Sequence, residues 1–362
     1  MVCQHFPMNR PTPLRGRGFI PTDKLTIITD MVSINEADNK VLAELETVAD
    51  RLRSAKASIE TVIFGQEQVI DLALIAILSG GHALLVGLPG LAKTKLAITL
   101  GKVLSLDERR VQFTPDLMPA DIVGSEVLEE SETGRRQFRF IGGPVFCQLL
   151  MADEINRASP RTQSALLQAM QEHHVTVAGQ RYDLPRPFHV LATQNPIEQE
   201  GTYPLPEAQL DRFVLEIDVP YPDLESERRM LFATTGGEEA EPRHVFTPSE
   251  LMAAQRLVRM IPVGDSVAEA ILKLVRSARP GSEADDFVNT NVAWGPGPRA
   301  SQALMLGARA RALLDGRLSP SIDDVVALAN PMLRHRMAIS FTARAEGLTL
   351  DRLIDRLTET IA

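Results

Sequence analysis

The stretch that decides the fold reads Gly87-Leu88-Pro89-Gly90-Leu91-Ala92-Lys93-Thr94. A mainly apolar run, residues 82–86, precedes it, and a helical pattern, residues 95–100, follows it. Strand, small-residue loop and helix are the context that a phosphate-binding loop requires. Backbone N–H groups at a helix N-terminus converge on phosphate oxygens, and Gly87 and Gly90 let the backbone approach them closely. The stretch therefore predicts a P-loop for a nucleoside triphosphate.

Individual positions of this loop have separate expected roles. We expect all residues from Gly87 to Lys95 to contact the nucleotide. Lys93 would reach the β- and γ-phosphates, and the Thr94 hydroxyl would ligate Mg²⁺. Ala92 stands where such loops usually carry a second glycine, and a methyl group is tolerable there if the residue is already helical. An ordinary strand–turn–helix that happens to carry Lys-Thr is the alternative interpretation.

Composition limits the class of protein. The chain has 362 residues, enough for about two domains, and 44% of them are hydrophobic. A net charge of −9 and only 5% aromatic residues disfavour a general nucleic-acid binder or an acidic-membrane binder. Of the two cysteines, Cys3 and Cys147, the second falls in a predicted buried strand, which indicates a reducing compartment. No apolar run approaches the length of a membrane span or of a signal-peptide core, so we expect a cytoplasmic protein without membrane insertion.

Three segments of the chain differ in pattern. Residues 1–38 show no sustained period at their start, and we expect a mobile N-terminal extension. Residues 39–240 alternate helical patterns with short apolar runs, which predicts a five-stranded parallel sheet covered by helices on both faces. Residues 241–362 carry helical patterns punctuated by Gly and Pro and no clear strand, which predicts an all-α domain.

The pattern places each element approximately. The expected strands are residues 82–86, 110–113, 145–151, 188–193 and 214–219. The expected hairpins are residues 126–141 and 174–183, and the expected helices of the first domain include residues 36–59, 66–79 and 159–172.

Two acidic residues, Asp153 and Glu154, follow the predicted strand at 145–151. Ligands of open parallel sheets bind at the carboxyl ends of the strands. Consecutive carboxylates at such an end are costly unless a ligand uses them. Asp153 would hold Mg²⁺ through its water shell, and Glu154 would polarise the attacking water. A pair of acids that caps the following helix is the alternative.

Asn195 lies just beyond the predicted strand at 188–193. Its amide can hydrogen-bond the γ-phosphate or the attacking water, whereas the alternative is turn formation, because Asn-Pro starts many turns. Tyr203, in the loop that follows, could face a central pore or only seal a turn. His82, His173, His174 and His189 do not have ligand spacing with the cysteines, so no structural zinc is expected.

Together these motifs resemble the MoxR family of AAA+ ATPases over roughly residues 40–350. The resemblance rests on the P-loop and on Ala152-Asp-Glu-Ile-Asn-Arg-Ala158, Gln163-Ser-Ala-Leu-Leu-Gln-Ala-Met-Gln-Glu172, Ala192-Thr-Gln-Asn-Pro196, Leu205-Pro-Glu-Ala-Gln-Leu-Asp-Arg-Phe213, Pro298-Arg-Ala300 and Leu333-Arg-His-Arg336. It implies an α/β fold, the P-loop AAA+ αβα sandwich, followed by a C-terminal all-α lid domain. The segment 116–127 corresponds to the insertion that marks the clade.

The resemblance also implies roles for two arginines. Arg212 matches the arginine finger that reaches the γ-phosphate bound by a neighbouring subunit, a task that suits a permanently charged, planar guanidinium. Arg157 and Arg161 are rival candidates, and a surface ion pair is the alternative. Arg299 matches the lid arginine that contacts the γ-phosphate within its own subunit. Its context, Gly-Pro-Gly-Pro-Arg, departs from the family's small-Ser-Pro-Arg, and a simple helix-start cation is the alternative.

The stretch 62–66 matches the turn that faces the adenine, with Ile63, Phe64 and Gly65 as the expected contacts. Phe64 could equally be a core residue.

For function, the resemblance implies Mg²⁺-dependent ATP hydrolysis by a homohexameric ring, with ATP and Mg²⁺ as cofactors. Family members act as chaperone-like remodellers or maturation factors for client enzymes, often with a partner that carries a von Willebrand factor A domain. The alternatives are the ATP-driven motor subunit of a metal chelatase and a nucleotide-dependent scaffold with little turnover. A DNA-translocating motor is disfavoured by the charge and the few aromatic residues, and no nucleic-acid partner is expected.

Overall fold

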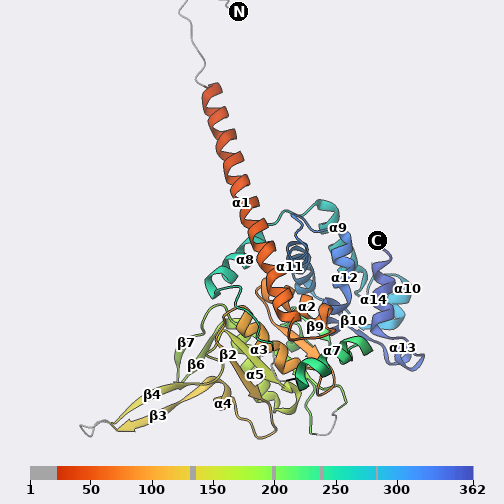
Figure 1. Ribbon diagram of the computed structural model, residues 1–362. Coiled ribbons are helices and arrows are strands. Elements are labelled where there is room, and N and C mark those ends of the chain that lie inside the picture. Colours follow the sequence, from red (N-terminus) through yellow and green to blue (C-terminus); the bar gives the residue numbers. More distant parts are fainter. Residues whose placement is uncertain (1–22, 131–135, 198–200, 237–239, 283, 362) are drawn as a thin grey trace, which may run out of the picture. The chain divides into compact units, whose positions relative to one another are not determined.

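A five-stranded, all-parallel sheet carries the P-loop. In the computed structural model its order is β2 (Glu108–Gln112), β5 (Leu149–Asp153), β8 (His189–Gln194), β1 (Ala83–Val86) and β9 (Leu215–Asp218) (Figure 1). Strand β1 therefore lies between β8 and β9, and the register pairs Val86 with Gln194 and Asp218. The carboxyl ends of these strands meet at one edge of the sheet, as the sequence pattern predicts.

The structure describes residues 23–130, 136–197, 201–236, 240–282 and 284–361, with side chains from residue 41 onward. The described residues divide into two units, with the boundary between Glu44 and Leu45. None of the described helices has the length and apolar character needed to cross a membrane.

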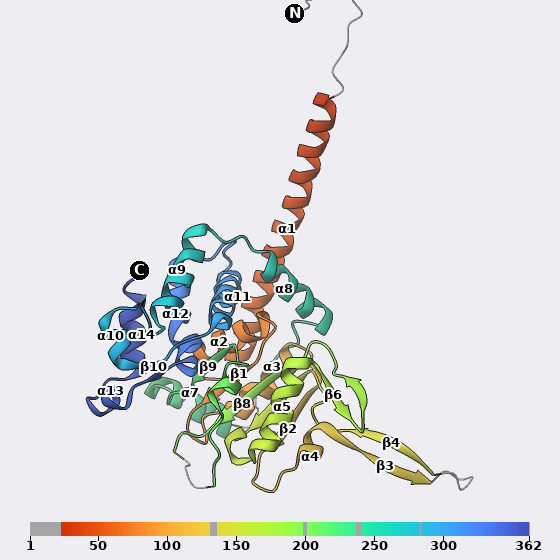
Figure 2. The same ribbon diagram turned by 180° about the vertical axis from the view of Figure 1, so that it is seen from behind.

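Helices cover both faces of the sheet (Figure 2). On one face, α5 (Pro160–Glu172) packs Leu166 and Met170 into the same buried cluster as Leu150, Ala152 and Val190. Because side chains alternate along a strand, Leu149 and Met151 point to the other face, where α3 (Lys93–Val103) contacts β5. Helix α2 (Glu67–Leu78) contacts β9. Near-continuous apolar strands are the expected result of such two-sided burial.

Two hairpins interrupt the α/β alternation. Strands β3 (Gly124–Glu130) and β4 (Arg136–Gly142) pair antiparallel and extend away from the sheet (Figure 1). Strands β6 (His174–Val177) and β7 (Gln180–Asp183) form the second hairpin. Both hairpins are confirmed, and the expected first turn, residues 132–135, lies outside the described residues. The short helix α4 (Pro119–Val123) precedes the first hairpin.

The C-terminal part is helical, as predicted, with one correction. Helix α7 (Leu224–Thr235) precedes this part, whose helices are α8 (Pro248–Met260), α9 (Asp265–Ser277), α10 (Asp286–Asn291), α11 (Pro298–Leu314), α12 (Ile322–Leu333), α13 (Phe341–Ala345) and α14 (Leu350–Thr358). The expectation of no strand is wrong, because β10 (Val292–Trp294) pairs antiparallel with β11 (Ala338–Ile339). Strands this short do not show the period-two pattern from which a strand can be recognised.

Two element boundaries also differ from the prediction. The strand expected at 145–151 begins only at Leu149, so Cys147 is fully buried but lies in the turn before the strand. Burial there reflects packing in the core cluster rather than strand pairing, and burial raises the pKa of the Cys147 thiol to about 12. Helix α1 (Asp23–Glu60) begins upstream of the predicted start at residue 36.

A short 3-10 helix, η2 (Arg334–Arg336), fastens the lid to the sheet domain. The Arg336 guanidinium is 3% exposed and donates to Asp211 Oδ1 and to the Val214 carbonyl, each at 2.8 Å. His335 Nε2 donates to the Phe213 carbonyl at 3.1 Å, and Arg334 pairs with Asp218 at the end of β9. The Arg-His-Arg motif therefore has a clear structural role in joining the two parts.

Candidate nucleotide site

The P-loop leaves the end of β1 and is fixed by its neighbours on both sides. The Gly87 N–H donates to the Gln194 carbonyl of β8 at 3.2 Å. A Cβ at Gly87 would lie 2.9 Å from the Val219 carbonyl, so the backbone of the loop passes closer to the chain after β9 than a side chain allows. Gly90 adopts φ +85°, the left-handed region that glycine favours.

Ala92 departs from the condition that the sequence interpretation set for it. Its backbone is left-handed, with φ 56° and ψ 17°, and α3 begins one residue later, at Lys93. The condition under which a methyl group would be tolerated without strain is therefore not met. The left-handed conformation costs a residue with a Cβ roughly 1–2 kcal/mol of conformational free energy. This cost explains why glycine is usual at the position.

Lys93 folds back over the loop. Its ammonium donates to the carbonyls of Gly87 and, at 3.1 Å, Leu88. Burial lowers its pKa, and the nearby carboxylates of Asp153 and Glu154 oppose that effect. The cation expected to bind phosphate and the two predicted catalytic carboxylates are therefore within electrostatic reach of one another. Thr94 occupies the next position of α3.

Asp153 is the last residue of β5, and its carboxylate is held on both oxygens. Thr193 Oγ1 donates to Oδ1 at 2.6 Å, and the Arg110 guanidinium donates to Oδ2 at 2.6 Å. A carboxylate and the hydroxyl of Thr94 are hard oxygen donors of the kind that Mg²⁺ prefers. Groups of three or more potential metal-binding side chains are not found among the described residues, which suits an ion that keeps water and phosphate ligands. The donor set thus fits Mg²⁺, which would have to share Asp153 with Arg110.

Glu154 is also left-handed, with φ 56°, and its N–H donates to Thr193 Oγ1 at 2.8 Å. Its carboxylate accepts hydrogen bonds from Gln112 Nε2 at 2.8 Å and from Arg157 Nη1 at 3.0 Å. Strained backbone of this kind is maintained only where the surroundings fix it. The side chain is therefore oriented by β2 on one side and by η1 (Ile155–Arg157) on the other.

Asn195 lies at the end of β8, where the prediction places it, and is 5% exposed. Its Oδ1 accepts the Ile197 N–H at 3.2 Å, so the turn-forming role proposed as the alternative is present. The amide nitrogen is the part of this side chain that has hydrogens for a phosphate oxygen.

A cavity of about 260 Å³ lies beside the P-loop. Its lining from the expected base-facing turn and from the loop comprises Val62, Ile63, Phe64, Gln66, Pro89, Gly90, Leu91, Ala92 and Lys95. Gly65 does not line it: this residue has φ +66°, and a Cβ there would lie 2.5 Å from Ser226 Cβ. This close approach packs the turn against α7, and the expected base contact at Gly65 remains a prediction.

Gln66 ties the turn to the P-loop and offers an acceptor to the cavity. Its Nε2 donates to the Leu91 carbonyl at 3.2 Å, while its Oε1 is buried without a hydrogen-bond partner among the described residues. A buried orphan acceptor is costly unless a ligand donor satisfies it. An exocyclic amino group, as on adenine, has the required chemistry.

The sequence interpretation missed the opposite wall of this cavity. It consists of residues between β9 and the end of α7, namely Tyr221, Pro222, Glu227, Met230 and Thr234. These residues can be expected once β9 is placed beside β1, because the chain that leaves β9 must then pass beside the P-loop.

The two arginines proposed from the resemblance lie near one another. Arg212 follows α6 (Glu207–Leu210), and its Nη1 donates to the Leu167 carbonyl of α5. Arg299 is the second residue of α11, and its Nη1 lies 3.8 Å from Asp211 Oδ2. Burial lowers the pKa of Arg212, and the positive charge of Arg299 lowers it further. The rival Arg157 pairs with Glu154 of its own chain, and Arg161 is exposed at the start of α5.

Comparison with known proteins agrees with this geometry. Residues 82–215 match the model of the ATPase family associated with various cellular activities, and residues 285–357 match the AAA lid domain. The chain is 38% identical to Chaperone MoxR1 of Mycobacterium tuberculosis, over 86% of this chain and 82% of that protein. It is 32% identical to Protein MoxR of Paracoccus denitrificans, over 86% and 96%. The chain belongs to the MoxR family of AAA+ ATPases.

A solved structure supports the same assignment for this MoxR-family ATPase. The crystal structure of a proposed ATPase from Cytophaga hutchinsonii superposes with a TM-score of 0.81 and 34% sequence identity, covering 90% of this chain and 98% of that one. The predicted αβα sandwich with a helical lid and the predicted ATPase activity are thus confirmed. The roles of individual site residues remain predictions.

Proposed function

We propose that this MoxR-family ATPase hydrolyses MgATP in a ring whose active sites are shared between neighbouring copies. The observation that carries the proposal is the convergence of Lys93, Asp153 and Glu154 at one edge of the sheet, beside a cavity with an orphan acceptor. Residues 87–95 and the turn at 62–66 would bind the nucleotide, and Thr94 and Asp153 would hold Mg²⁺, which supplies charge neutralisation at the phosphates.

Each remaining residue has one task in this scheme. Glu154 accepts a proton from the attacking water, for which its hydrogen bonds to Gln112 and Arg157 must be exchanged. Asn195 and Arg299 contact the γ-phosphate within the chain, and Arg212 contacts the γ-phosphate held by the next copy. A guanidinium keeps its charge even when burial lowers its pKa, so the Leu167 carbonyl that now accepts from Arg212 can be replaced by a phosphate oxygen.

A mixing experiment tests the shared site. Lys93→Ala should abolish ATP binding, and Arg212→Ala should bind ATP but lose about 10³-fold or more in turnover. Mixed in equal amounts, the two inactive variants should recover up to about a quarter of wild-type turnover, because an Arg212→Ala site then meets an intact Arg212 of its neighbour. Arg161→Ala, mixed in the same way, distinguishes the rival finger. Normal turnover by Arg212→Ala alone would refute the finger assignment.

Magnesium dependence has its own test. Chelation with EDTA should stop turnover, and added Mg²⁺ should restore it. Asp153→Asn should raise the Mg²⁺ concentration needed for half-maximal turnover, because it removes the anionic ligand. Turnover that persists in excess EDTA would contradict this part of the proposal.

We further propose that the ATPase remodels or matures client proteins, in line with the chaperone name of its mycobacterial relative. By family resemblance, the partner would carry a von Willebrand factor A domain and the client would be an enzyme. Affinity capture with Glu154→Gln, which should bind ATP and stall, tests this. Recovery of such a partner would support the proposal, whereas recovery of tetrapyrrole-pathway subunits would indicate a chelatase motor.

A further inference from the structure

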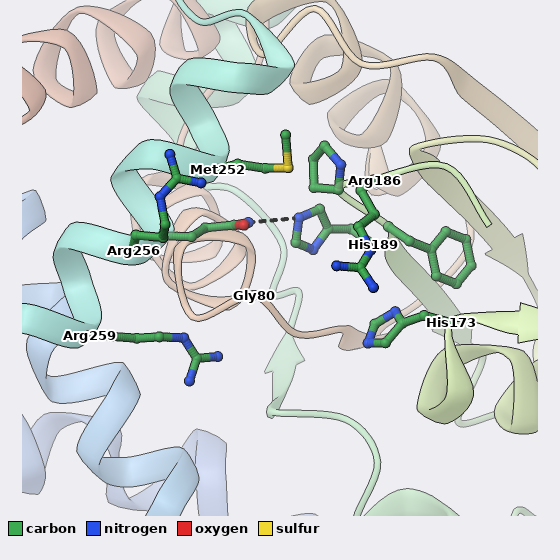
Figure 3. A pocket seen from close by; sticks show the side chains of 10 residues that line it. Gly80, His173, Arg186, His189, Met252, Arg256 and Arg259 are labelled. Carbon is green, nitrogen blue, oxygen red and sulfur yellow. Dashed lines mark hydrogen bonds between the residues drawn. The ribbon is translucent and has the colours of Figure 1, made fainter. Parts of the chain in front are cut away.

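A second hollow, of about 330 Å³, lies away from the P-loop edge of the sheet. It adjoins His189, the first residue of β8, and Gly80, which precedes β1, whereas the P-loop follows the last residue of β1. Parallel strands place those two positions at opposite edges of the sheet. The side chains that concern us are His173, Arg186, His189, Met252, Arg256 and Arg259 (Figure 3), and we call this site the arginine pocket.

Two walls from different parts of the chain form the arginine pocket. Helix α8 supplies Arg256 and Arg259, and the segment that leads into β8 supplies Arg186. Figure 3 shows the side chains of Arg186 and His173 reaching into the hollow from one side and that of Arg259 from the other. A ligand between them would therefore contact both the sheet domain and α8.

The floor of the arginine pocket is neutral and fixed. His189 is 1% exposed and donates from Nδ1 to the Gly81 carbonyl at 2.8 Å. Its Nε2 accepts from Gln255 Nε2 at 3.0 Å, and the same amide donates to the Ile77 carbonyl at 2.8 Å. Burial lowers the pKa of His189 to about 4, so this side chain adds no charge near pH 7.

The positive charge of the arginine pocket is not balanced locally. No carboxylate lines the hollow, and within the described part of the chain none of its three arginines forms an ion pair. Burial lowers the pKa of His173 and that of Arg309, and the positive charges of Arg186 and Arg259, respectively, lower them further. Such a concentration of cations is unexpected in a chain with a net charge of −9. All three arginines are exposed, so their guanidinium groups are accessible to an anion from solvent.

We propose that Arg186, Arg256 and Arg259 form a binding site for a small organic phosphate, separate from the nucleotide site. Guanidinium groups present planar forks of donors that match phosphate oxygens in pairs. Met252, with Pro187 and Phe188, adds an apolar wall against which the organic part of the ligand packs. The volume admits a sugar phosphate or a compound of similar size. Occupation of the site would hold α8 against the sheet domain.

Calorimetric titration with inorganic pyrophosphate tests this proposal. The protein is first saturated with ADP, so that the P-loop is filled, and Mg²⁺ is omitted because it chelates pyrophosphate. Wild-type protein should bind one pyrophosphate per chain. Each arginine–phosphate contact contributes about tenfold in affinity, so Arg186→Ala/Arg259→Ala should bind about 100-fold more weakly. Arg352→Ala, an exposed arginine of α14, is the matched control and should bind as the wild type does.

A second variant keeps the test independent of the arginine substitutions. Met252→Glu places a carboxylate in the wall and should also weaken pyrophosphate binding, with the melting temperature showing that the fold is retained. Equal affinity of the wild type and the double arginine variant would overturn the proposal, as would absence of pyrophosphate binding. Binding of a phosphoserine peptide but not of pyrophosphate would overturn the assignment to a small molecule.

Discussion

At the scale of single residues, the site combines strain with competing charges. Ala92 and Glu154 are both left-handed at the two functional loops, and Asp153 is already paired with a cation of its own chain. Such features cost stability and persist where the surrounding structure fixes them. Two predictions follow from these local costs.

The first concerns Ala92. Glycine relieves a strain of about 1–2 kcal/mol at φ 56° but loses about 0.5–1 kcal/mol through backbone entropy. Ala92→Gly should therefore raise the free energy of unfolding by up to about 1 kcal/mol in the absence of nucleotide, whereas Ala92→Val should lower it. Urea denaturation measures both. Ala97→Gly, within the right-handed part of α3, is the control and should be destabilising; a loss of stability in Ala92→Gly would contradict the argument.

The second concerns Arg110, whose guanidinium lies 2.6 Å from Asp153 Oδ2. Removing a competing, half-exposed cation from this carboxylate should lower the Mg²⁺ concentration for half-maximal ATP turnover about two- to fivefold in Arg110→Ala. Arg109→Ala removes a similar charge from the same strand but lies 3.9 Å from Asp107 instead. An unchanged Mg²⁺ requirement in Arg110→Ala, or an equal change in both variants, would be inconsistent with competition at Asp153.

At the scale of elements, η2 joins the lid to the sheet domain. Arg336 is buried and donates hydrogen bonds to Asp211 and to the carbonyls of Val214 and Met332. A buried charge network of this kind is sensitive to loss of one partner, because the other groups are left without donors in a region closed to water.

Arg336→Met should therefore lower the free energy of unfolding by about 3–5 kcal/mol. Thermal melting followed by circular dichroism provides the measurement, and Arg352→Ala provides a control with the same loss of charge at an exposed position. A loss below about 1 kcal/mol, the range of a surface pair, would show that the lid is held by other contacts.

At the scale of the whole molecule, three histidines are buried in neutral form. Burial lowers the pKa of His82 to about 3 and that of His189 to about 4, and it lowers the pKa of His335 well below its ordinary value of 6.5. His82 Nε2 donates to the Met170 carbonyl, and its Nδ1 accepts the Val190 N–H at 3.0 Å, which fixes its neutral tautomer. Protonation is therefore opposed in the folded state only.

The sign of the pH dependence follows directly. Below pH 6.5 the unfolded chain binds protons that the folded chain does not, so stability is complete above pH 6.5 and decreases as the pH falls toward 4. The loss should approach about 1.4 kcal/mol per pH unit for each histidine within that window. Urea denaturation at pH 7.5, 6.5, 5.5 and 4.5 checks this, and His82→Gln/His189→Gln should flatten the profile. Equal stability at pH 7.5 and 4.5 would contradict it.

Much of the fold could be predicted from the sequence because its signals are local. Short apolar runs locate the sheet strands approximately, and a helical pattern with Pro160 in its first turn locates α5. The two-stranded sheet of β10 and β11 could not be predicted, because strands of two and three residues form only by pairing with a partner distant in the chain. The position of Cys147 in the turn before β5, rather than in the strand itself, depends in the same way on core packing.

The sequence by itself determined the family, the P-loop and the acidic and amide residues at the ends of β5 and β8, because each belongs to a continuous motif with a local backbone requirement. Tertiary structure alone decided what surrounds them. It placed Arg110 on Asp153, turned Ala92 left-handed, closed the cavity beside the P-loop with α7 and placed three arginines around the arginine pocket. These relations join segments that are far apart in the chain, and strand order and helix packing, rather than any local pattern, bring them together.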